Sequence, residues 1–213
     1  MKTEALIDRL GETLRPVPRG AAARILLLGL SAGAAASFVL MVCWLGIRPD
    51  LTAAVATFPY WMKFAYTLAL ACLAFWTLQR LARPGVRAGT QAALEILPPA
   101  AIGVLAVLQW NAAPAALHTH LLMGASHTVC PWRIVALALP IFAGLLWSMR
   151  RLAPTRPMLA GAAAGLLAGA AGAWIYAFHC DESAAVFVAV WYSFGIALTG
   201  LLGAVAGRWL LRW

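Results

Sequence analysis

The sequence predicts an all-α membrane protein, a polytopic bundle of six transmembrane helices with both termini in the cytoplasm. Of the 213 residues, 63% are hydrophobic and only 11% are charged, whereas soluble domains carry about a quarter charged residues. The apolar residues also form long stretches without charge, which indicates helices rather than the alternating strands of a membrane barrel. This composition excludes a soluble enzyme and a secreted disulfide-rich domain.

Six charge-poor stretches are long enough to cross a membrane, because a transmembrane helix needs about 20 predominantly apolar residues. The first lies between Arg24 and Arg48 and contains 23 uncharged residues. It is longer than the apolar core of a signal peptide, so we expect a retained helix rather than a cleaved leader. The second stretch begins near Phe58 and ends near Arg80.

The other four stretches are delimited by charged residues and loop formers. The third begins near Glu95, and Asn111 and Pro114 mark its end. Charged residues flank the last three stretches in the same way. The predicted helices cover residues 24–47, 60–80, 94–112, 130–149, 158–178 and 184–207.

Prolines and glycines add detail to these helices. The pair Pro98–Pro99 and the single Pro140 predict kinks in the third and fourth helices. The fifth helix contains two overlapping Gly-x-x-x-Gly motifs between Gly161 and Gly169, and the sixth is also rich in glycine. Small residues at this spacing allow transmembrane helices to pack closely, so we expect close packing of both.

The distribution of positive charge predicts the orientation. Thirteen of the 16 Lys and Arg residues lie in the N-terminal segment, the second and fourth loops and the C-terminus, and three lie in the other loops. The positive-inside rule therefore places both termini in the cytoplasm of a bacterial inner membrane. Topology alone explains the net charge of +9, so we expect no direct nucleic-acid binding.

The chain divides into a cytoplasmic segment, residues 1–20, and a six-helix transmembrane domain, residues 21–213. In the first segment, Leu6, Leu10 and Leu14 recur every four residues. This spacing predicts one apolar stripe along a short amphipathic helix. Such a short helix is marginal alone and is expected to order against a partner.

Two partners are possible for this amphipathic helix. A helix that lies on the membrane surface usually carries Lys and Arg on its polar face. Here the acidic row of Glu4, Asp8 and Glu12 balances the basic residues of the segment. This charge balance favours a protein with an apolar groove over anionic lipid as the partner.

The opposite side of the membrane collects the reactive side chains. Cys130 stands at the start of the fourth helix, and Cys180 stands at the end of the fifth. Because a short loop joins these two helices, we expect them to be neighbours, with the two cysteines at the same membrane depth. Cys43 and Cys72 are expected to be packing residues, since a free cysteine behaves as a small hydrophobe.

Four interpretations of the two cysteines remain open. They form a permanent disulfide, act as a redox switch, bind a soft metal ion, or are unrelated small residues at helix ends. The metal would be zinc, copper or a cadmium-like ion, because thiolate and imidazole are soft ligands. The candidate metal ligands are Cys130, Cys180, His127, His179, Asp181 and Glu182.

The predicted membrane interior contains few ionisable residues. Transporters and membrane enzymes usually need such groups inside the bundle. Lys63, Glu95 and Arg133 all lie near the ends of the predicted helices. The pattern therefore favours a bundle that senses or signals over one that transports or catalyses.

Taken together, these features resemble the NrsF-type integral-membrane anti-sigma factors of Proteobacteria. The resemblance rests on the amphipathic N-terminus that ends in Leu-Arg-Pro-Val, on the six helices, and on two motifs. One motif is Cys130-Pro-Trp-Arg at the start of the fourth helix, and the other is His179-Cys180-Asp-Glu after the fifth. The resemblance covers essentially the whole chain.

The resemblance implies a non-enzymatic regulator that sequesters an extracytoplasmic-function sigma factor at the inner membrane. It also implies that Cys130 and Cys180 are sensors, needed to release the sigma factor under heavy-metal or oxidative stress. The residues expected to bind the sigma factor are Leu6, Ile7, Asp8, Leu10, Leu14 and Arg15. The alternative functions are a membrane thiol oxidoreductase or a small soft-metal-binding transport protein that uses the same Cys/His cluster.

Overall fold

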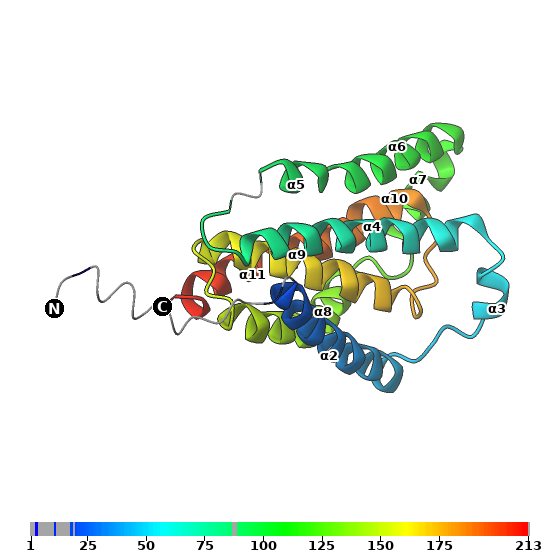
Figure 1. Ribbon diagram of the computed structural model, residues 1–213. Helices are drawn as coiled ribbons and strands as arrows, with labels where there is room; N and C mark the ends of the chain where they lie inside the picture. Colours follow the sequence, from blue (N-terminus) through cyan, green and yellow to red (C-terminus); the bar gives the residue numbers. More distant parts are fainter. Residues whose placement is uncertain (1–2, 4–10, 12–17, 19, 87–88, 213) are drawn as a thin grey trace.

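The structure is a computed structural model that describes residues 3, 11, 18, 20–86 and 89–212 (Figure 1). Throughout this part of the chain the regular structure is helical. Six helices are long and apolar enough to cross a membrane, which confirms the predicted all-α bundle with six membrane-spanning helices; the orientation of the termini stays a prediction. They are α2 (Ala21–Trp44), α4 (Phe58–Leu81), α5–α6 (Gly89–Leu94 and Leu97–Ala112), α8 (Cys130–Arg150), α9 (Pro157–Tyr176) and α10–η2–α11 (Ala185–Phe187, Val188–Tyr192 and Ser193–Leu210).

Helix α9 is the centre of the bundle and packs against α4, α8 and α11. Alanines and glycines make up most of its buried positions, and they let neighbouring backbones approach closely. A Cβ atom added at Gly161 would meet the carbonyl oxygen of Gly203 on α11, and one at Gly165 would meet that of Thr199. The predicted close packing of the two glycine-rich helices is therefore confirmed.

Helix α2 packs against α8 through a second glycine contact. Gly29 lies directly against Gly144, and Gly33 lies against the backbone of Ile141. Either glycine of α2 would clash with α8 if it carried a side chain. The two helices are therefore in backbone contact over two turns.

Two serines fasten the same pair of helices. The hydroxyl of Ser37 on α2 donates to the carbonyl oxygen of Leu137 at 2.7 Å. The hydroxyl of Ser148 on α8 donates in the other direction, to the carbonyl oxygen of Ile25 at 2.8 Å. Interhelical hydrogen bonds of this kind are worth about 0.6 kcal/mol each in a membrane. The helix that follows the N-terminal segment is thus attached to the helix that begins at Cys130.

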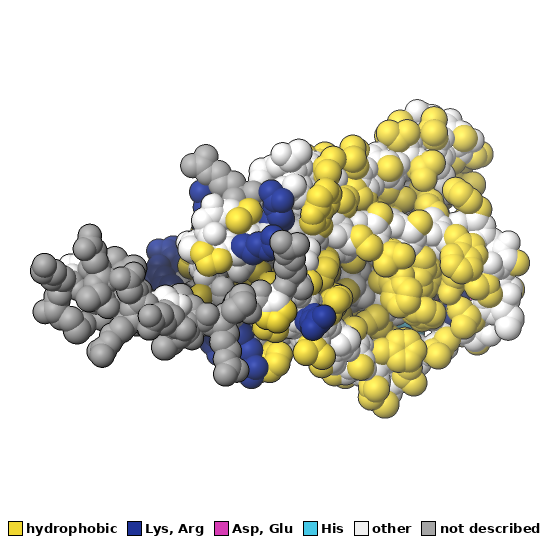
Figure 2. Space-filling view, in the orientation of Figure 1, with side chains coloured by type: hydrophobic (Ala, Val, Ile, Leu, Met, Phe, Trp, Pro, Cys, Tyr) yellow, Lys and Arg dark blue, Asp and Glu magenta, His cyan; other side chains and the backbone are white. Residues whose placement is uncertain are grey.

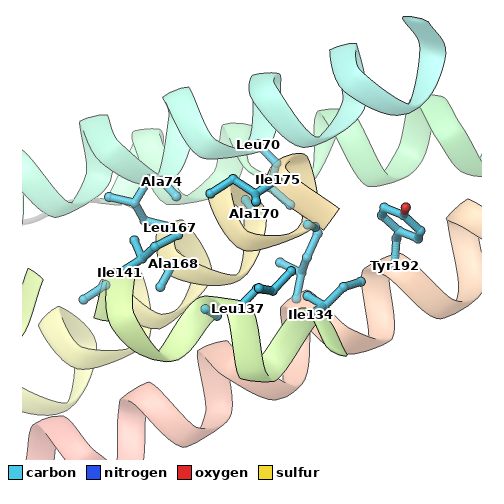
Figure 3. Close-up of a cluster of buried hydrophobic side chains, with 14 of the residues drawn as sticks. Leu70, Ala74, Ile134, Leu137, Ile141, Leu167, Ala168, Ala170, Ile175 and Tyr192 are labelled. Atoms are coloured by element: carbon cyan, nitrogen blue, oxygen red, sulfur yellow. The ribbon is translucent and has the colours of Figure 1, made fainter. Parts of the chain in front are cut away.

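The hydrophobic core lies where α4, α8 and α9 meet (Figure 3). Helix α9 contributes buried side chains all around its axis, and Tyr192 lies at one end of the cluster. The labelled core residues are Leu70, Ala74, Ile134, Leu137, Ile141, Leu167, Ala168, Ala170, Ile175 and Tyr192.

The third span lies at the edge of the bundle (Figure 1). It is interrupted between α5 and α6, just before Pro98 and Pro99, where the missing backbone N–H groups prevent a continuous helix. Only Pro98 and Ile102 of α6 are buried. In contrast, α8 continues through Pro140 from Cys130 to Arg150.

The two ends of the bundle differ in chemistry. Basic side chains gather at the end where α4, α8 and α11 finish and α9 begins (Figure 2), and we call this the arginine end. The opposite end, where α8 begins and α9 finishes, is the cysteine end. It also holds the short helices α3 (Leu51–Ala54), η1 (Ala115–Leu117) and α7 (His118–Met123). Exposed apolar side chains cover the surface between the two ends, as expected for a lipid-facing belt.

Candidate functional site: a buried cysteine pair

Cys130 and Cys180 meet inside the cysteine end. Cys130 is the first residue of α8. Cys180 lies in the turn after α9, where its backbone N–H donates to the carbonyl oxygen of Tyr176 at 3.0 Å. Their exposed fractions are 0% and 2%. Both thiols are free, and they lie close enough for each to affect the ionisation of the other. The short connection between α8 and α9 thus brings the cysteines together, as the sequence suggested.

Cys43 and Cys72 differ from this pair. Both also carry free thiols, but they are exposed on the surface of the bundle. We expected both to be packing residues, and their exposure shows that neither packs inside the core of the bundle. A helix bundle in lipid can present small apolar side chains outward, because the membrane is as apolar as the core.

Lys63 is a charged group beside the turn that carries Cys180. Its side chain extends from α4 and is fully buried, with an exposed fraction of 0%. The ammonium group donates to the carbonyl oxygens of Cys180 at 2.8 Å and Glu182 at 2.7 Å. Within the described residues the one ion pair is Arg48–Asp50, so Lys63 has no carboxylate partner there.

Two tyrosines complete the wall around the thiols. Tyr176 lies beside Cys130, and Tyr192 lies beside Cys180. Both hydroxyl groups are buried without a hydrogen-bond partner in the described part of the chain. Tyr192 belongs to η2, a π-helical interruption of the sixth span, and such interruptions are frequent at functional sites.

The environment of Cys180 favours its ionised form. The neighbouring Cys130 thiol has the largest influence on the pKa of the Cys180 thiol, and the positive charge of Lys63 acts in the same direction. Both lower the pKa of Cys180, although burial alone would raise it. A lowered pKa favours the thiolate, the form that reacts with oxidants.

Arg48 holds the turn that contains Cys180 from the loop after α2. Its guanidinium donates to the carbonyl oxygen of Cys180 at 3.2 Å, and its backbone N–H donates to that of Phe178 at 3.1 Å. The same guanidinium donates two further hydrogen bonds of 2.7 Å to the carboxylate oxygens of Asp50. These bonds lower the pKa of Asp50 and raise that of Arg48, because each group stabilises the charge of the other.

His179 connects three segments at the same end. Arg133 on α8 contacts Nε2 of the imidazole at 3.2 Å, and Nδ1 contacts the carbonyl oxygen of Gly46 at 3.0 Å. Arginine can only donate, so Nε2 accepts and the proton resides on Nδ1. The loop after α2 is therefore linked to both cysteine-bearing helices.

Of the six candidate metal ligands, the two cysteines are brought together and the other four have other surroundings. The Glu182 carboxylate accepts backbone N–H groups from Ala125 at 2.6 Å and Ser126 at 3.2 Å. The ring of His127 packs against Trp191, with 5.5 Å between ring centres. Asp181 is exposed. Across the described residues, no group of three His, Cys, Asp or Glu side chains could hold a metal ion.

Glu182 acts as a clamp between the segments that carry Cys180 and Cys130. Its carboxylate binds the turn before α8, and the backbone N–H of Cys130 donates to the carbonyl oxygen of Ser126 in that turn at 2.8 Å. We expect Glu182→Ala to raise the rate at which a small maleimide labels Cys130 and Cys180 by about tenfold. Hydrogen bonds to a charged group are worth about 1.5–3 kcal/mol, and about 1.4 kcal/mol corresponds to a factor of ten. Asp181→Ala is the matched control and should change nothing. Equal labelling of both variants and the parent would show that Glu182 is no clamp.

The predicted sigma-binding residues Leu6, Ile7, Asp8, Leu10, Leu14 and Arg15 lie outside the described residues. Most of the segment 1–20 does so as well, and the division at residue 20 stays a prediction.

Sequence reasoning missed Lys63, Tyr176 and Tyr192. Lys63 was interpreted only as a charge near a helix end, although a lysine within an apolar span is itself a signal of function. The tyrosines sit among apolar residues, and no spacing in the sequence marks them. Their position beside the thiols depends on how α4, α9 and the sixth span pack.

The similarity to known proteins extends over nearly the whole chain and is not limited to one motif. The family described as "Negative regulator of sigma F" (NrsF) matches residues 10–213. The chain is 39% identical over 216 residues to the "Anti-sigma-F factor NrsF" of Caulobacter vibrioides, and the match covers 100% of both chains. It is 37% identical over 213 residues to the "Probable anti-sigma-F factor NrsF" of Azospira oryzae, again with 100% of both covered. No solved structure matches the chain.

Proposed function

Because the chain belongs to the family of negative regulators of sigma F, its partner is a sigma factor, and we propose how it holds and releases that partner. The N-terminal segment sequesters a sigma factor of the extracytoplasmic-function class at the inner membrane. Oxidation of Cys130 and Cys180 then releases it. The observation that carries this proposal is the buried pair of free thiols at one end of the bundle.

The orientation follows from charge. The arginine end, where α2 begins, lies in the cytoplasm by the positive-inside rule. The cysteine end then faces the periplasm, a compartment in which disulfides form and persist. Sensor and sigma-binding segment are thus on opposite sides of the membrane.

Oxidation by a hydroperoxide balances as a two-step reaction. The Cys180 thiolate attacks one peroxide oxygen, the O–O bond breaks, hydroxide (or alkoxide) leaves, and a sulfenic acid forms. The Cys130 sulfur then attacks the Cys180 sulfur, the S–O bond breaks, and water leaves with the Cys130 proton. The two sulfurs lose two electrons in total, and the peroxide gains them.

A soft metal ion is the less favoured trigger. Zinc sites that are purely structural need four ligands, and soft ions generally take thiolate and imidazole donors. No third side chain of a suitable type joins the two cysteines in the described residues. Disulfide formation requires only the two thiols that are present.

The contacts of α2 supply a route for the signal. The loop after α2 bonds to the turn containing Cys180 through Arg48 and His179. The helix itself lies in backbone contact with α8, which begins at Cys130. Closing a disulfide between these elements therefore acts on α2, and through it on the N-terminal segment.

The required energy is modest. A hundredfold loss of sigma affinity corresponds to about 2.7 kcal/mol. Coupling free energies between distant sites are typically about 1–3 kcal/mol. One covalent bond between two helices is sufficient to supply this difference between two bundle states.

Binding of the sigma factor by the leucine stripe is testable with one substitution. We expect Leu10→Glu in the full-length protein to weaken sigma binding by about 2–3 kcal/mol, because a charge replaces an apolar anchor in a groove. Glu12→Gln, on the opposite face of the predicted helix, is the control. Co-purification of the sigma factor with each variant measures the effect. Full retention by Leu10→Glu would place the stripe on lipid instead.

A further inference from the structure

Lys63 is a buried cation without a carboxylate partner in the described residues. Burial of an unpaired charge is expensive, and ionisable groups inside a membrane bundle usually face a functional partner. Two of its three N–H donors bind the carbonyl oxygens of Cys180 and Glu182. The third donor is available for a negatively charged group next to it.

The two thiols have unequal surroundings. Lys63 and Arg48 both donate to the carbonyl oxygen of Cys180, and Lys63 also donates to that of Glu182. Among the hydrogen bonds of the described residues, none joins either cation to Cys130. The two cationic groups are therefore held at the turn that carries Cys180, which favours negative charge on its sulfur.

No acid competes for this role at the described cysteine end. Asp50 is bound to Arg48, and the Glu182 carboxylate is bound to the turn before α8. Asp181 is exposed. The remaining charged or titratable neighbours, Arg133 and His179, bind each other. The sulfur of Cys180 is thus the group best placed to neutralise Lys63.

We propose that Lys63 makes Cys180 the attacking thiol of the pair and leaves Cys130 as the thiol that closes the disulfide. Lys63 is a positioning residue in this scheme, because it fixes the Cys180 turn through two hydrogen bonds and supplies the charge that a thiolate needs. This inference rests on the proposed oxidation of the pair.

The assignment predicts which sulfur reacts first. In full-length protein with Cys43 and Cys72 replaced by serine, Cys130→Ser treated with hydrogen peroxide should accumulate a sulfenic acid on Cys180, trapped by dimedone and located by mass spectrometry. Cys180→Ser should label at Cys130 at least about tenfold more slowly. Equal or reversed labelling would overturn the assignment.

A test of the role of Lys63 removes its charge and keeps the size of the side chain similar. We expect Lys63→Met, in the Cys130→Ser background, to slow dimedone labelling of Cys180 by about tenfold or more. The pH at which the labelling rate rises should also move to higher values. Lys63→Gln, which keeps a donor, should behave like Lys63→Met, and Lys63→Arg should stay close to the parent. Labelling of the neutral variants at the parental rate and pH profile would overturn the proposal.

Failure of this inference is distinguishable from failure of the proposed function. If peroxide releases the sigma factor from the protein that lacks both Cys130 and Cys180, the proposed function is wrong whatever Lys63 does. If that protein does not respond while Lys63→Met reacts and responds like the parent, only the role of Lys63 is wrong.

Discussion

Cells that carry Cys130→Ser will retain the sigma factor at rest and will not release it under oxidative stress. Serine cannot form a disulfide, and the buried position it occupies accepts a small side chain. The thiol of Cys180 remains, but it has no partner to close the bond. Sigma-dependent transcription after peroxide treatment is therefore expected to stay within about twofold of the resting level, whereas a typical coupling energy of 1–3 kcal/mol changes affinity by about 5–150-fold. A sigma-dependent reporter measures this response.

The chain supplies its own control for this experiment. Cys43→Ser and Cys72→Ser remove exposed thiols outside the buried pair, and both variants should respond like the parent. Constitutive transcription in the Cys130→Ser strain would contradict the account, because it would assign the cysteine to sigma retention. A normal response in that strain would remove the disulfide from the mechanism.

Replacing Gly165 with leucine will destabilise the bundle more than any other substitution considered. A Cβ atom at this position would collide with the carbonyl oxygen of Thr199 on α11. The nearest atoms, from Thr199 and Gly200, are all backbone, so they cannot move aside without separating α9 from α11. Overpacking of a well-packed core costs about 1–3 kcal/mol and occasionally more, and we expect the upper part of this range.

The matched control is Gly103→Leu. Gly103 also lies within a membrane-spanning helix, α6, but nothing lies within 4 Å of a Cβ atom built there. Thermal unfolding of both purified variants in detergent, followed by circular dichroism, should separate them clearly. Similar midpoints would mean that the close approach of α9 and α11 does not hold the bundle together.

The fold could be predicted almost completely because the membrane imposes a simple rule. A span needs an uninterrupted apolar stretch, and charged residues or loop formers mark most of the ends, so the pattern along the sequence located six helices. The glycine motif around Gly165 also predicted close packing. The central position of α9 and the peripheral position of α6 did not follow, because both helices are apolar and only tertiary contacts separate them.

The site could be predicted only in part. Cys130 and Cys180 were found because connectivity fixes which helix ends are neighbours. Lys63 was missed, since its role depends on the α4 face that meets the turn after α9. Glu182 was expected as a ligand, and in the structure its carboxylate instead binds backbone N–H groups of a turn. A carboxylate next to a cysteine is compatible with either role, and the sequence alone does not distinguish them.

The central claim is that the redox state of the two cysteines sets the affinity for the sigma factor. The most direct test reconstitutes the full-length protein in nanodiscs and measures sigma binding before and after treatment with hydrogen peroxide, while mass spectrometry follows the Cys130–Cys180 disulfide. The account predicts that binding weakens by about a hundredfold as the disulfide forms, equivalent to about 2.7 kcal/mol, and that Cys130→Ser keeps its affinity. Unchanged binding by the fully oxidised protein would contradict it.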